Sequence, residues 1–152
     1  MYEQDYILRI IGLWGQAIRR ALESLRIGHQ AEALEYAEQA IRLALDTDPA
    51  LALRLTPEGL VAYLGIGGDI DSRRAQMLAD ALDARARVLL EMGRDGEADL
   101  DTARADAVRE AAGIEAVSDF VLELARDDDV GDLRQIGEDT DVAVDEITGE
   151  DV

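Results

Sequence analysis

The chain has 152 residues, with 34 Asp and Glu against 15 Arg, no Lys, Asn or Cys, and a single histidine, His29. A formal net charge of −19 argues against nucleic acid or an anionic membrane surface as the main partner, because both require cationic patches on the protein. The absence of cysteine excludes disulfides, thiolate nucleophiles and cysteine-based zinc sites. The length suits one domain with its own core.

In the first segment, apolar residues recur at alternating spacings of four and three, which predicts a helix over residues 5–27. Gly28 stands where a C-terminal cap is expected. Further apolar residues widen the stripe, so we expect this helix to be buried on two sides. One side would pack on the second helix. The other would pack on the later hairpin or on a second copy of the chain, with Ile7, Ile11 and Trp14 as contact residues.

The rest of the body also has helical periodicity, with a proline or a capping residue at several helix starts and glycine at several ends. The expected helices span residues 30–46, 57–64, 72–92, 95–112 and 114–126. Thr56 is the expected N-cap of the short helix, and Asp71 or Ser72 caps the long one. No stretch of alternating β-branched residues competes with this pattern. The predicted fold is all-α, built from antiparallel helical hairpins with five to six helices.

The negative charge is concentrated at the C-terminus. Residues 127–152 hold eleven acids against Arg134 alone, and they contain no aromatic residue and no helical apolar period. Such a composition buries too little apolar surface to offset the entropy of ordering. We therefore predict a helical domain over residues 1–126 and a disordered acidic tail over residues 127–152.

The most apolar stretch, residues 7–18, is interrupted by Arg9 and Gln16 and follows two acidic residues. It is too short and too polar to span a membrane, and its flank is wrong for a signal peptide. The sequence therefore predicts a cytoplasmic protein without a membrane partner.

The chain resembles itself when it is shifted by 65 residues, which predicts two copies of a helix, a glycine turn and a second helix. Seven identical pairs at this offset carry the resemblance. Arg20, Ala21, Leu25, Gly28, Glu32, Ala33 and Ala40 fall on Arg85, Ala86, Leu90, Gly93, Glu97, Ala98 and Ala105.

The spacing of Ala21, Gly28, Glu32-Ala33 and Ala40 and of their counterparts resembles the tetratricopeptide repeat. The resemblance implies antiparallel helical hairpins, although the family's first-helix aromatic positions hold Ala17 and Ser24 here. The offset also departs from a tandem array of about 34 residues. In addition, residues 3–11 resemble the opening of a bacterial helical family described only as a domain of unknown function, which implies a fold and no activity.

The chain offers few groups for metal or cofactor chemistry. His29 with Glu32 and Glu35 supplies too few converging ligands for a metal site. Residues 65–68 are glycine-rich, but no strand precedes them, and Asp69 and Asp71 would repel a phosphate. Residues 127–138 have acids at calcium-loop positions but lack the required glycine. We expect no cofactor and no metal, and we interpret Asp80, Asp83, Arg87 and Glu91 as surface ion pairs.

A helical protein-interaction module is the favoured function, because stacked hairpins present a concave surface and no reacting group is evident. A peptide or helix would bind in the groove between the hairpins through apolar contacts and through Arg20 and Arg85, which would pair with carboxylates. The alternatives are a homodimer or larger homo-oligomer assembled through the first helix and an acidic tail that binds a basic protein. Enzymatic activity is not expected.

Overall fold

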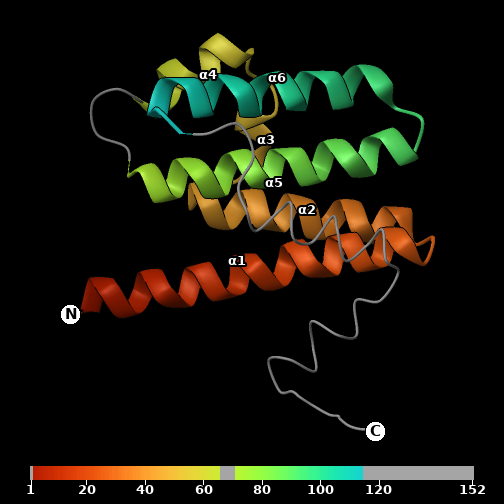
Figure 1. The fold of residues 1–152 in the computed structure, drawn as a ribbon, viewed down its shortest axis with the longest axis horizontal. Coiled ribbons are helices and arrows are strands. Elements are labelled where there is room, and N and C mark those ends of the chain that lie inside the picture. The colour runs from red at the N-terminus through yellow and green to blue at the C-terminus, as the bar shows by residue number, and fades with distance from the viewer. Residues whose placement is uncertain (1, 66–70, 115–152) are drawn as a thin grey trace, which may run out of the picture. The chain divides into compact units, whose positions relative to one another are not determined.

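The computed structural model describes residues 2–65 and 71–114, and these ranges form helices and turns without a strand. The helices are α1 (Tyr2–Arg26), α2 (Gln30–Leu45), α3 (Pro49–Ala52), α4 (Pro57–Leu64), α5 (Ser72–Glu91) and α6 (Asp95–Ala112) (Figure 1). The prediction of an all-α fold with five to six helices is confirmed. The helix expected over residues 114–126 and the expected tail at residues 127–152 lie outside the described residues, apart from Ile114.

Side-chain capping sets the starts of α4 and α5 as the sequence predicts. The side chain of Thr56 accepts a hydrogen bond from the Gly59 amide (2.9 Å) at the start of α4, and Asp71 caps α5. The helix α3 is not among the helices expected from the sequence. Asp48 caps this four-residue helix, in which proline occupies the first position and needs no amide partner.

The helix α5 is the most extensively buried part of the described chain, because it packs against α1, α2 and α6. Its buried apolar residues are Ala75, Met77, Leu78, Ala79, Ala81, Leu82, Ala84, Ala86, Val88 and Leu89. The helices α1 and α2 also pack on each other, and α4 packs on α6. In Figure 1, α1, α2, α5 and α6 lie side by side in that order.

The turns of the two hairpins repeat the same geometry at the 65-residue offset. Gly28 and Gly93 have φ of 88° and 79°, a left-handed conformation that glycine adopts without a side-chain clash. The next amide in each turn, that of His29 and that of Arg94, donates to a carbonyl five residues earlier at 2.8 Å. The predicted repetition of a helix, a glycine turn and a second helix is confirmed at the level of this backbone geometry.

The side chain of Trp14 is only 6% exposed, and its indole Nε1 donates to the carbonyl oxygen of Met77 on α5 (3.1 Å). The helix α1 therefore packs on α2 with one side and on α5 with another, all within one chain. This is the intramolecular alternative for the first helix. The indole of Trp14 is therefore packed inside the chain and contributes little to its surface.

Candidate functional site

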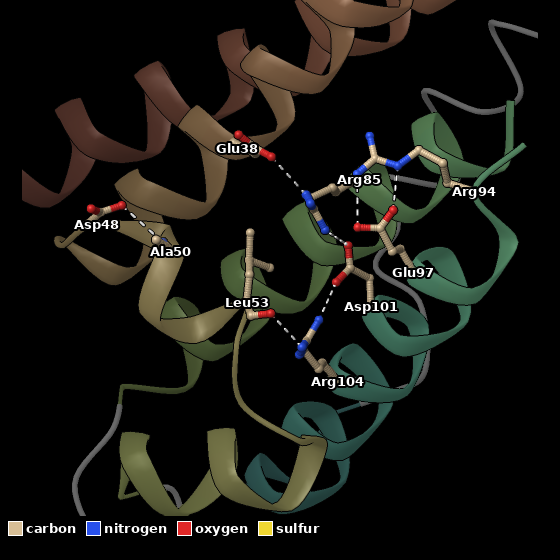
Figure 2. Close-up of polar contacts among 9 residues, drawn as sticks. All are labelled: Glu38, Asp48, Ala50, Leu53, Arg85, Arg94, Glu97, Asp101 and Arg104. Carbon is tan, nitrogen blue, oxygen red and sulfur yellow. Dashed lines mark hydrogen bonds and ion pairs between the residues drawn. The ribbon is translucent and has the colours of Figure 1, made fainter. Parts of the chain in front are cut away.

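Arg85, which the sequence analysis placed in an open groove, lies between α2, α5 and α6 and is 8% exposed. Its Nη1 donates to Asp101 on α6 (2.6 Å), and its Nε donates to Glu38 on α2 (3.2 Å), as Figure 2 shows. The prediction that Arg85 lines an open groove is therefore wrong, and the reason is the packing of α2. Because α2 packs on α5, it places its own carboxylate over the guanidinium, and Arg85 is engaged inside the chain.

Arg104 extends this network toward the segment between α3 and α4. Its guanidinium donates to Asp101 (2.7 Å) and to the carbonyl oxygens of Leu55 (2.7 Å) and Leu53 (2.8 Å). Asp101 is 0% exposed, and burial raises the pKa of its carboxyl, while the two arginines oppose that rise. With Glu38, whose side chain is 37% exposed, the network holds two guanidinium groups against two carboxylates.

A second buried ion cluster joins α5 to α6. Asp80, expected on the surface, is 1% exposed, and its carboxylate accepts a hydrogen bond from Arg109 (2.9 Å). The same guanidinium nitrogen donates to Asp83, and Asp106 lies 3.9 Å from the neighbouring nitrogen. One cation therefore serves two carboxylates. Burial is the largest cause that raises the pKa of Asp83 to about 6, and the nearby charge of Asp80 adds to it.

The interpretation of Asp80 and Asp83 as surface ion pairs is therefore wrong, because α6 covers that side of α5. Asp101 and Arg104 were missed altogether. The sequence contained a signal for Asp101, since it lies on the stripe of Ala98, Ala105 and Val108, all three of which are buried. An acid on such a stripe requires a buried cation, and Arg104 and Arg85 supply it.

The outward face of α1 takes no part in these clusters. Arg9, Leu13, Gln16 and Arg20 follow one another at spacings of four, three and four, and all are exposed. We call these four residues the α1 stripe. Leu13 is 45% exposed, so almost half of an apolar side chain is open on this face.

A hollow lies beside the α1 stripe, between α1 and α2. It is lined by Leu13, Gln16, Ala17, Arg20, Tyr36 and Gln39. The guanidinium carbon of Arg20 lies 5.8 Å from the centre of the Tyr36 ring, which is within the range of a cation–π contact. The hollow thus combines an exposed leucine, a stacked cation and two amides.

The five residues predicted as partner contacts separate into two groups. Arg20 is exposed, and Ile7 and Ile11 are half-buried on α1 next to the exposed Tyr6 and Leu8. Trp14 and Arg85 are buried within the chain. The structure therefore leaves Arg20 on the outward side of α1. Ile7 and Ile11 precede Trp14 by seven and three residues, so they lie on the Trp14 side of α1, roughly opposite Arg20, and do not belong to the α1 stripe.

Within residues 2–65 and 71–114, no three histidine or carboxylate side chains converge in a way that would hold a metal ion. His29 and Glu32 form an exposed pair at 3.3 Å. Residues 66–70 of the glycine-rich loop and the acids of residues 127–138 lie outside the described part. In that described part, no helix is both long and apolar enough to cross a membrane. No family model, no curated protein and no solved structure matches the chain.

Proposed function

We propose that the chain is a non-enzymatic, tetratricopeptide-like helical module that binds a protein or peptide through the α1 stripe and the adjoining hollow. This proposal moves the contact from a groove between the hairpins to the first helix. The move is required because Arg85 is bound to Glu38 and Asp101, whereas Arg20 faces solvent beside the hollow.

The exposure of Leu13 is the observation that carries the proposal. Exposed apolar side chains that gather on one face favour a docking contact, because covering them releases ordered water. Tyr6, seven residues or about two turns before Leu13, continues the apolar surface toward the start of α1. A partner that covers these side chains would gain about 25 cal/mol for each square ångström of apolar surface removed from water.

Charge also favours this face for an acidic partner. The helix α1 contains four arginines against three acids, in a chain whose net charge is −19. A cationic stripe within a negative protein attracts carboxylates locally and fixes their position, although the whole chain repels acidic molecules at long range. An amphipathic segment with one or a few acids fits these conditions better than a strongly acidic one.

Replacing Leu13 by glutamate is expected to abolish capture of the natural partner from a lysate of the source cells. The added charge would place a carboxylate in the apolar part of the contact while leaving the fold intact, because the side chain is exposed. Leu51→Glu, at a similarly exposed leucine outside α1, is the matched control and should retain the partner. Circular dichroism would check that both variants are folded. Identical sets of captured proteins for the wild type and Leu13→Glu would contradict the proposal.

A further inference from the structure

The α1 stripe has a counterpart on α5 that is already covered by a helix. Shifted by 65 residues, the stripe falls on Arg74, Leu78, Ala81 and Arg85, and three of the four pairs are identical. On α5, Leu78, Ala81 and Arg85 are at most 8% exposed, whereas all four residues of the α1 stripe are exposed. The same surface is thus buried in the second hairpin and open in the first.

The helix that covers this surface of α5 is α2, and three hydrogen bonds define its placement. Arg85 donates to the Glu38 carboxylate, Arg74 donates to the carbonyl oxygen of Ala44 (2.9 Å), and Gln30 donates to the carbonyl oxygen of Glu91 (3.1 Å). As residue numbers rise along α2, the numbers of their partners on α5 fall. The two helices are therefore antiparallel, and the residues between Glu38 and Ala44 lie opposite Leu78.

The residues that line the hollow beside the α1 stripe also have counterparts in the second hairpin at the 65-residue offset. Its six lining residues fall on Leu78, Ala81, Leu82, Arg85, Asp101 and Arg104, and every one of these is buried. In the second hairpin, the side chain of Glu38 and the carbonyl oxygens of Leu53 and Leu55 bind the arginines of this set. Among the described residues of the first hairpin, Arg20 instead stacks on Tyr36, the counterpart of Asp101.

From this correspondence we infer that the partner is an α-helix that lies antiparallel to α1 and occupies the place that α2 occupies on α5. The helix carries a carboxylate that pairs with Arg20, as Glu38 pairs with Arg85. One turn later it carries an apolar residue that covers Leu13, in the position of the fully buried Ile41. The inference rests on the proposed function, since it specifies which kind of partner the α1 stripe binds.

A second copy of the chain does not meet these requirements while its helices are packed as described, because its α2 already covers its own α5. The counterpart of α2 is α6, and it presents Ala103 and Asp106 where α2 presents Glu38 and Ile41. Both α6 residues are exposed, so the face is open but carries the wrong side chains. Stacking of α6 from one copy on α1 of another would leave Arg20 without its carboxylate at that position and would bury Asp106 against Leu13.

The α2 sequence itself supplies the probe. A fluorescently labelled peptide of residues 30–45 is titrated with the full chain, and binding is followed by fluorescence anisotropy. We expect saturable binding to the wild type and a loss of about tenfold or more for Arg20→Glu, the effect of reversing one charge in a paired contact. Arg54→Glu is the matched control, because it makes the same change of charge at an exposed arginine outside α1. It should bind the peptide like the wild type. A peptide with Glu38→Arg should bind the wild type weakly and regain affinity for Arg20→Glu.

Absence of saturable binding to the wild type, or equal affinity for the wild type and Arg20→Glu, would overturn the inference. If the peptide bound by displacing the chain's own α2 from α5, its affinity would not depend on Arg20. The wild type and Arg20→Glu would then bind the peptide equally. The experiments can show the inference to be wrong while the proposed function still holds. If the peptide does not bind while Leu13→Glu still loses the natural partner, the α1 stripe remains the binding surface and the partner is not a helix of this kind.

Discussion

Replacing Asp101 by alanine is expected to lower the free energy of unfolding by about 3–5 kcal/mol, which is a large part of the stability of a domain this size. The carboxylate is fully buried and accepts hydrogen bonds from Arg85 and Arg104. Its removal leaves two guanidinium groups inside the protein with only Glu38 and two backbone carbonyls as partners. The loss therefore comes from unpaired buried charge more than from a lost contact.

Urea denaturation followed by circular dichroism would measure this change, with Asp99→Ala as the matched control. Asp99 is an exposed acid two residues away on the same helix, and its replacement should change the stability by no more than about 0.5 kcal/mol. A similar, small effect for both variants would mean that the network around Asp101 does not hold α6 in place.

Asp83, in the ion cluster with Asp80 and Arg109, should make the chain more stable as the pH falls. Most carboxylates in folded proteins have the opposite effect. The pKa of Asp83 is about 6 in the folded chain and about 4 when unfolded, so the folded state binds the proton more tightly. Its contribution is complete below the unfolded pKa and is lost as pH rises through 6. Between pH 7 and pH 5 the folded state should gain about 1 kcal/mol from this group.

The comparison of the wild type with Asp83→Asn isolates this contribution, since the other acids titrate in both proteins. The stability of the wild type relative to the variant should rise by about 1 kcal/mol on going from pH 7 to pH 5. Asp106→Asn removes the exposed acid of the same cluster and should keep most of the wild-type pH dependence. A difference between the wild type and Asp83→Asn that stays constant over this range would contradict the account.

Helix positions could be predicted from the sequence because their determinants are local. Gly28, Gly93 and Gly113 take positive φ at helix ends, and Thr56 caps its helix through an amide three residues away. Each of these interactions involves residues that are close in the chain, so no knowledge of the tertiary packing is needed. The same locality explains the missed α3, where a cap and a proline also form a helix of one turn.

The candidate site could be predicted only in part, because exposure depends on which helices meet. Arg20 and Arg85 occupy equivalent positions in the repeat, and the sequence analysis gave them the same role. The structure separates them, since α2 lies over Arg85 and no described helix lies over the outward side of Arg20. Asp80 shows the same difficulty, because its burial is set by α6, which begins fifteen residues later.

The internal repeat nevertheless contained more information than the seven identities first noted. Arg9 and Leu13 also match Arg74 and Leu78 at the same offset, and these pairs lie on the face that α2 covers in the second hairpin. Identities on a face that is buried in one repeat and open in the other support the proposed binding surface more specifically than identities in the shared core, which serve packing in both repeats.

The central claim is that another polypeptide contacts the chain at the α1 stripe. Photo-crosslinking in source cells tests it most directly, with a benzophenone amino acid placed at Gln16, inside the hollow, and separately at Leu90, an exposed leucine on α5. The account predicts a covalent adduct with another polypeptide from position 16 and none from position 90. Adducts of equal yield from both positions, or none from position 16, would contradict it.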